Sequence, residues 1–298
     1  MSMESRLFIY VALAADLVIA VTKFIAAGFT GSSAMISEGI HSIIDSVNQL
    51  LILLGIKRSK KKADERRPFG YGRELYFWSF IVSLLIFSVG GCISFYEGIL
   101  RFRKPPSEQN QTWNYIVLAV AFVFTAITVV ITFKKFNKQR GELGFYQAIR
   151  QSKDPSIFIV LLGDLGDLLG LLIAFLGVYL GHLFHNPYYD GIASMIIGIF
   201  LIAVSLLLVR ESRSLLMGET VGKKTLRKII ALTEADPSIV KVKRHFSIYM
   251  APEEVILQLI AVFKKDLTTQ QITDAIKRIS KSIQEKFPPI KQIFIEPA

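Results

Sequence analysis

The feature that most constrains the fold of this chain is a series of six apolar stretches, each long enough to cross a lipid bilayer. They lie near 7–29, 34–56, 75–100, 113–133, 156–181 and 188–209. Crossing a hydrocarbon core of about 30 Å takes roughly 20 residues of helix. A chain of 298 residues that is 52% hydrophobic would also struggle to bury its apolar surface as a water-soluble globule. The sequence therefore predicts a polytopic α-helical membrane protein with six spans.

Positive charge is concentrated in alternate loops, which predicts the orientation of the chain. The second loop holds eight basic residues, the fourth holds six and the third holds three, whereas the first and fifth hold none. Cytoplasmic loops of membrane proteins are rich in lysine and arginine, so we expect the even-numbered loops in the cytoplasm. With six spans, both termini then lie in the cytoplasm as well. The net charge of +11 then reflects topology and attraction to lipid headgroups, and no nucleic-acid site is expected.

Hydrophobicity falls after about residue 212, where charged and apolar positions begin to alternate as they do in soluble domains. The patterns there predict the order helix, strand, strand, helix, strand, over 223–235, 239–250, 254–263, 267–287 and 290–297. Such an order suits a small α+β domain with its helices on one face of the sheet. We therefore predict a six-helix transmembrane domain over 1–212 and a cytoplasmic α+β domain over 213–298.

Four residues of metal-ligand type lie at matched depth in the second and fifth spans. With a rise of about 1.5 Å per residue and an outer face near residue 33, His41 lies about 12 Å and Asp45 about 18 Å from the outside. The fifth span runs the other way from an inner face near residue 156, which puts Asp164 about 12 Å and Asp167 about 16 Å from the inside. Asp164 is then level with Asp45, and Asp167 is nearly level with His41.

Ionisable side chains at this depth are costly unless they are paired, hydrated or bound to a metal, so they are candidates for function. Helical spacing puts His41 and Asp45 on one face, and Asp164 and Asp167 on another. One imidazole and three carboxylates suit zinc, and three carboxylates also admit manganese, iron, cobalt or cadmium. Metal and protons compete for His41, because only neutral imidazole binds metal, and a proton gradient could therefore drive metal exchange.

Three further polar residues of the first two spans have open roles. Glu38 lies about 7 Å from the outer face, and Lys23 of the first span lies at similar depth. An ion pair between them and metal ligation by Glu38 are alternatives. Asn48, one turn inward of Asp45, either orients a ligand or bonds a neighbouring helix. The single cysteine, Cys92, lies inside the third span and excludes an intramolecular disulfide.

Several motifs together resemble the cation diffusion facilitator family over nearly the whole chain. They are the six expected spans, SEGIHSIID in the second span, a basic loop that ends RRPFGYGRELYFW, and the terminal α+β domain. The stretch that begins LLGLLIAFLG and ends LLMGE is similar to the branch of mitochondrial zinc-transporter-like members and their bacterial relatives. The resemblance implies a homodimer that exports zinc or a similar divalent ion from the cytoplasm in exchange for protons. It also implies a ferredoxin-like cytoplasmic domain that aids dimerisation.

The resemblance carries over residue by residue, with one departure. His41 and Asp45 match the family's pair in the second span, and Asp167 matches the aspartate of the H-x-x-x-D motif in the fifth. The first position of that motif falls on Gly163, which has no side chain to donate. In the branch that this chain resembles, an acidic pair tends to occupy 163 and 164, so only Asp164 remains of it. Either Asp164 becomes the fourth ligand after a modest helix rotation, or water fills the position.

Two other functions compete with proton-coupled export. One is a metal-binding homologue with little transport. The other is a metal-dependent membrane phosphotransferase, because DGIASM at Asp190 is similar to the start of the CDP-alcohol transferase motif. The arginine and the later aspartates of that motif are missing, and the chain has no H-E-x-x-H. We therefore expect a transporter and not an enzyme, with zinc as its first candidate substrate and the bacterial inner membrane as its location.

Overall fold

The computed structural model describes most of the chain as two compact units. The described residues are 13–14, 17–22, 24–25, 28, 33–104, 111–140, 144–145, 148, 152–186 and 188–298, with the backbone alone for 33–41, 111–114, 117, 135 and 139–140. One unit comprises Met1–Lys57 with Phe77–Arg213, and the other comprises Arg58–Tyr76 with Ser214–Ala298. The second unit thus includes a loop that the sequence prediction counts within 1–212.

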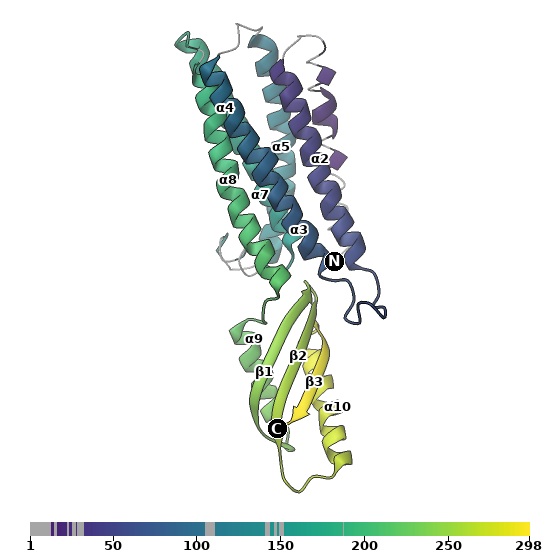
Figure 1. The fold of residues 1–298 in the computed structure, drawn as a ribbon. Helices are drawn as coiled ribbons and strands as arrows, with labels where there is room; N and C mark the ends of the chain where they lie inside the picture. Colours follow the sequence, from purple (N-terminus) through teal and green to yellow (C-terminus); the bar gives the residue numbers. More distant parts are fainter. Residues whose placement is uncertain are drawn as a thin grey trace. The chain divides into compact units, whose positions relative to one another are not determined.

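Long helices make up the first unit (Figure 1). In chain order they are α2 (Ser33–Ser59), α3 (Glu74–Leu85), η1 (Ile86–Ile93), α4 (Ser94–Arg103), α5 (Gln111–Arg140), α7 (Pro155–Leu183) and α8 (Tyr188–Met217). The π-helical segment η1 joins α3 to α4 in one continuous helix. Within the described residues, four helices are long and apolar enough to cross a membrane: Glu74–Arg103, Leu118–Lys138, Pro155–Leu183 and Tyr188–Met217. The predicted second span corresponds to α2, and about half of the first predicted span, 7–29, lies outside the described residues.

The start of α7 is fixed by its own sequence. The Asp154 carboxylate accepts a hydrogen bond from the Ser156 backbone amide at 3.1 Å, which satisfies a donor that no helical carbonyl can reach. Pro155 occupies the first helical position, where a missing N–H costs nothing. The residues from Ile157 to Leu162 are then all buried. This start sets which residues of α7 face the interior of the bundle one turn later.

Glycines bring α8 into close contact with the continuous helix 74–103. A Cβ atom on Gly198 would lie 2.5 Å from the Phe95 backbone nitrogen, and one on Gly98 would lie 2.6 Å from the Met195 backbone nitrogen. A Cβ on Gly91 would lie 2.6 Å from the Ile202 side chain. No side chain fits at such distances, so the two helices pack backbone to backbone, as small residues allow between membrane helices.

The loop of the second unit is organised around Tyr71. The Tyr71 hydroxyl donates to Asp64 Oδ2 at 2.6 Å, and Lys61 Nζ donates to the same oxygen at 3.0 Å. These hydrogen bonds, the one from Tyr71 foremost, lower the pKa of Asp64 to about 2. Gly72 packs against the C-terminal part of the unit, because a Cβ there would lie 2.5 Å from the Met250 carbonyl oxygen. The PFGYGR motif therefore forms a hydrogen-bonded loop that packs on the C-terminal part of the unit.

The C-terminal part has the predicted order of helices and strands. Its elements are α9 (Lys223–Glu234), β1 (Ile239–Ala251), β2 (Glu254–Phe263), α10 (Thr269–Lys286) and β3 (Ile290–Pro297). The strands lie in the order β1-β2-β3, with β1 antiparallel and β3 parallel to β2. Ile229 of α9 and Ile279 of α10 share one buried core with Leu257 and Leu259 of β2, so both helices cover the same face (Figure 1). The predicted small α+β domain is confirmed.

Two local contacts fix α10 in this domain. Thr268 caps the helix, since its Oγ1 accepts from the Gln271 backbone amide while Gln271 Oε1 accepts from the Thr268 amide. Arg278 of α10 donates to both carboxylate oxygens of Asp236, at 2.7 and 2.9 Å. The fork of the guanidinium thereby ties α10 to the turn between α9 and β1.

Candidate functional site

Asp45 and Asp167 lie where two cavities of the helical unit meet. Asp45 of α2 and Asp167 of α7 line both a large cavity of about 210 Å³ and a small cavity of about 40 Å³. The large cavity reaches Arg101 of α4 and Ser194 of α8, whereas the small cavity reaches Ile52 of α2. Because the helices run along the bundle, the two cavities lie toward its opposite ends. The two carboxylates therefore form the wall that both cavities share.

The small cavity is polar and acidic. Its polar lining residues are Asp45, Asn48, Gln49, Asp164 and Asp167. No lysine or arginine is among the described residues that line it. Carboxylate and amide oxygens are ligands for divalent cations of the magnesium and manganese kind, and carboxylates also bind zinc. The composition of this cavity therefore favours a cation as its occupant.

Asp164 is held in place by a residue of the neighbouring helix. Thr132 of α5 lies with its Oγ1 3.0 Å from Asp164 Oδ2 and 2.7 Å from the Thr128 carbonyl oxygen, so its one hydroxyl proton serves these two acceptors. The Thr132 side chain has no exposed surface, and Asp164 is 8% exposed. A buried carboxylate of this kind needs a partner, and Thr132 supplies it.

Gly163 leaves room in the small cavity. It is among the lining residues, and a Cβ built on it would meet no heavy atom within 4 Å. The other glycines of α7 differ, since a Cβ on Gly177 would lie 2.5 Å from Ala193. The helix therefore does not need a glycine at 163 for packing, and this position is free to carry a side chain or to leave space for a ligand.

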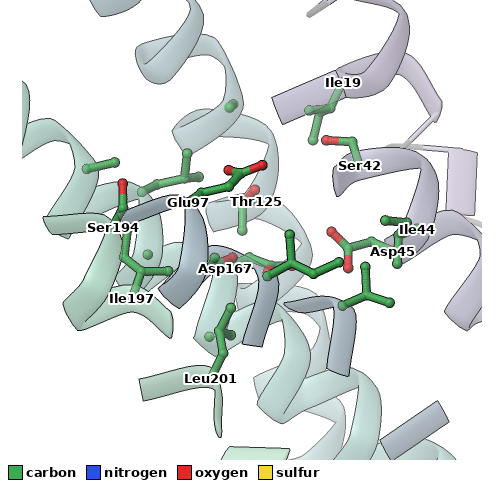
Figure 2. Close-up of a pocket in the computed structure, with 18 of the residues that line it drawn as sticks. Ile19, Ser42, Ile44, Asp45, Glu97, Thr125, Asp167, Ser194, Ile197 and Leu201 are labelled. Carbon is green, nitrogen blue, oxygen red and sulfur yellow. The ribbon is translucent and has the colours of Figure 1, made fainter. Parts of the chain in front are cut away.

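The large cavity carries a third carboxylate and an ion pair. Figure 2 shows Asp45, Asp167 and Glu97 facing this cavity from α2, α7 and α4. Arg101, one turn beyond Glu97, also lines the cavity, and its Nη1 donates to Asp190 Oδ2 of α8 at 2.9 Å. The cavity thus gives Asp45 and Asp167 a partly polar route toward the end of the bundle where α4 ends and α8 begins. Asp190, the first residue of DGIASM, is therefore the ion-pair partner of Arg101.

The structure brings together only part of the predicted ligand set. Asp45, Asp164 and Asp167 share the small cavity, together with Asn48 and Gly163. The side chains of His41 and Glu38 lie outside what the structure describes, although both belong to α2, and Lys23 is not described at all. Among the described side chains, no three His, Cys, Asp or Glu residues are close enough to hold a metal ion together. The three aspartates therefore line one space without forming a closed site.

Two residues of the site escaped the sequence analysis. Thr132 belongs to a stripe with Thr125 and Thr128, at helical spacing on an otherwise apolar span, and such a stripe favours a face turned toward neighbouring helices. Glu97 is an acid near the end of the third predicted span and could have been flagged by the same depth argument as Asp45. Both signals were present, but neither identifies the helix that the side chain faces.

Comparison with known proteins places these observations in a family. Residues 9–217 match the model of the cation efflux transmembrane domain. The chain is 34% identical over 219 residues to the proton-coupled zinc antiporter SLC30A9, mitochondrial, of Xenopus laevis, a match that covers 73% of this chain and 39% of that protein. It is 26% identical over 300 residues to the manganese efflux system protein MneP of Bacillus subtilis, covering 98% of this chain and 95% of that protein. Its C-terminal part is similar to a solved nickel form of the MamM CTD, at 13% identity and a TM-score of 0.25, over 26% of this chain and 96% of that one.

The family match spans more than two thirds of the chain and includes every helix of the site. The chain spans about two fifths of the length of the zinc antiporter that it matches. The family is one of membrane transporters, which confirms at this level the prediction of a non-enzyme and of an integral membrane protein. From the motifs of its spans and the matched model, the chain belongs to the cation diffusion facilitator family of cation efflux proteins.

Proposed function

We propose that this protein exports a divalent metal cation from the cytoplasm in exchange for protons, through a site between α2 and α7. One observation carries the proposal: Asp45 and Asp167 line both cavities, which lie toward opposite ends of the bundle. A small tilt of the helices would then be enough to move the access of a cation between these two carboxylates from one cavity to the other. Such rocking around a fixed site near the midplane is how many secondary transporters alternate access.

The charge of the loops supports a side of the membrane for each cavity. The small cavity lies toward the end of α2 that leads into the basic loop of residues 57–73, which is expected in the cytoplasm. Cytoplasmic metal would therefore enter by the small cavity and leave by the large one. The volumes of about 40 and about 210 Å³ suit a conformation in which the outward route is wide and the inward route is narrow.

Cation binding must pull the ligands together. His41, Asp45, Asp164 and Asp167 are the proposed ligands, and the described acids among them do not yet form a closed group. When these ligands converge on a cation, α2 and α7 would move closer together and both cavities would become narrower. Protons that return to His41 and the carboxylates would release the cation again, which couples the two fluxes.

The comparisons support a substrate of the zinc and manganese kind. One relative is named as a zinc antiporter and another as a manganese efflux protein. Zinc remains the first candidate from the motif of the second span, and iron, cobalt and cadmium complete the set to be tested. No resident cofactor is proposed, because the metal is the cargo.

The remaining parts of the proposal concern topology and assembly. We place six spans in the bacterial inner membrane, with both termini in the cytoplasm and a ferredoxin-like domain over 213–298 that aids a homodimer. The charge of the loops and the match to MneP along nearly the whole chain support this arrangement. For Glu38 we keep the two alternatives, an ion pair with Lys23 that joins the first two spans or ligation of the metal.

Flux in proteoliposomes tests the proposal. The purified protein would be given inward gradients of zinc, manganese, iron, cobalt and cadmium, with a pH-sensitive dye to follow protons and a metal-sensitive dye to follow uptake. We expect metal uptake matched by proton efflux. The variants Asp45→Ala and Asp167→Ala should abolish both, while Asp274→Ala, an exposed acid of α10, should leave both unchanged.

The outcomes separate the competing functions. Normal flux in Asp45→Ala or Asp167→Ala would refute the site. Metal binding that needs Asp45 but produces no flux of any ion would favour a homologue that binds metal without transporting it. Metal flux without proton movement would support the proposed metal route and refute the proposed exchange for protons.

A further inference from the structure

Asn48 presents a buried oxygen that lacks a partner in the described structure. The residue is 7% exposed, and its Oδ1 makes no hydrogen bond to the described part of the chain. Buried carbonyl oxygens in native proteins are almost always satisfied, because leaving one unpaired forfeits its interaction with water. An oxygen that is left open in this way can accept a ligand that arrives from outside the chain.

The position of Asn48 indicates which ligand that is. It lies three residues after Asp45 on α2, on the same face of the helix, and lines the small cavity with Asp164 and Asp167. No basic side chain is among the described residues lining this cavity. An amide oxygen next to carboxylates, with no cation from the protein, suits a metal ion as its partner.

Gly163 opens the same cavity further. Gly163 lines this cavity, and a Cβ built at 163 would meet nothing within 4 Å. This space admits a water molecule as an additional ligand. Carboxylate, carbonyl and water oxygens in an expanded shell are typical of manganese, whereas zinc prefers four ligands that include nitrogen or sulfur.

Resting on the export function proposed above, we propose that Asn48 Oδ1 is a direct ligand of the transported cation in the small cavity. Together with the space at Gly163, it adds oxygen ligands to the proposed set of His41 and three carboxylates, which moves the preference of the site from zinc toward manganese. Asn48 is then a specificity-determining residue and more than a helix-packing group.

A matched asparagine elsewhere in the bundle provides the control. Asn137 of α5 also has a buried Oδ1 without a hydrogen-bond partner in the described structure, but it is not among the residues lining either cavity. If an open amide oxygen mattered only for folding, replacing either asparagine would have the same effect.

Binding of manganese alone and of zinc alone to the full-length protein in nanodiscs, by isothermal titration calorimetry, tests the inference. We expect Asn48→Leu to weaken manganese binding at least tenfold and zinc binding by less. Asn48→Asp should keep the wild-type preference, because it retains the oxygen, and Asn48→His should shift the ratio at least tenfold toward zinc. Asn137→Leu should leave both affinities unchanged.

Asp45→Ala separates this inference from the function on which it rests. Loss of binding in Asp45→Ala with wild-type binding in Asn48→Leu would overturn the role of Asn48 and leave the export site intact. Equal weakening of both ions in Asn48→Leu, with no change of ratio in Asn48→His, would make Asn48 a structural residue and also overturn the inference. Wild-type binding in Asp45→Ala would refute the export site itself.

Discussion

Replacing Thr132 with valine should weaken metal binding without disturbing the fold. Valine has nearly the shape of threonine, and Thr132 is fully buried, so the substitution leaves no large cavity. It removes the hydroxyl that lies 3.0 Å from Asp164 Oδ2. A hydrogen bond to a charged group contributes about 1.5–3 kcal/mol, and 1.4 kcal/mol corresponds to about tenfold in affinity. Groups that orient a metal ligand typically contribute about 10–100-fold, and we expect a loss within that range.

Thr128→Val is the control for this prediction. Thr128 lies one turn away on α5, is 7% exposed, and its hydroxyl donates to the Thr125 carbonyl oxygen at 2.8 Å, not to a carboxylate. Calorimetric titration of each variant with zinc and with manganese gives the two affinities, and thermal unfolding gives the stability. Equal affinities in Thr132→Val and the wild type would show that Asp164 needs no support from α5. An equal loss in both variants would show that the effect comes from the helix and not from the hydrogen bond.

Three further predictions test the cavities, the packing and the cytoplasmic domain. Ala174 lines the large cavity, so Ala174→Trp should reduce flux in the proteoliposome assay at least tenfold while metal still binds. The control is Leu172→Trp, on the exposed side of α7, which should transport normally. Gly198→Ala should destabilise the protein by about 1–3 kcal/mol through overpacking against Phe95, whereas Gly163→Ala, with open space around its Cβ, should not lower the melting temperature. The Arg278 guanidinium holds the pKa of Asp236 below its ordinary value, so Arg278→Gln should lower the melting temperature by a constant amount at neutral pH. This difference should shrink as the pH falls below the ordinary pKa of an aspartate, about 3.9, and Asp236 becomes protonated.

The linkage behind the last prediction has a definite sign. A carboxyl group whose pKa falls on folding stabilises the native state above its unfolded pKa, and this contribution is lost as the pH falls through the folded value. A melting difference that grew on acidification would therefore contradict the assignment of the Asp236 pKa to Arg278.

The sequence was informative where a pattern was rare or repeated. An acid within an apolar span is rare, so Asp45, Asp164 and Asp167 could be selected without a structure, and their depths follow from the rise of a helix. The cytoplasmic domain could be predicted because its strands and helices each repeat their apolar residues with the proper period.

Contacts between helices could not be predicted in the same way. Threonine is common in membrane helices, and nothing in the sequence of α5 shows that Thr132 meets Asp164 of α7. The sequence does not decide whether Asn48 orients a metal ligand or bonds a neighbouring helix. The lack of a described partner for its Oδ1 is a property of the packed bundle and not of α2 alone. The charge of the loop predicts topology, but nothing in its sequence shows that Gly72 packs onto the C-terminal part.

The π-helical segment η1 links the packing of the bundle to its cavities. A π-helix bonds each amide to a more distant carbonyl than an α-helix does, so its turns hold more residues, and the helix after it is rotated relative to a continuous α-helix. In α4 this rotation turns Gly98 toward the backbone of α8, while Glu97 and Arg101 face the large cavity. The same segment contributes Ile86 to the small cavity and Val89 to the large one. Because η1 borders both cavities and sets the rotation of α4 against α8, a change in its hydrogen bonding would move the wall of the route together with the contact of α4 with α8.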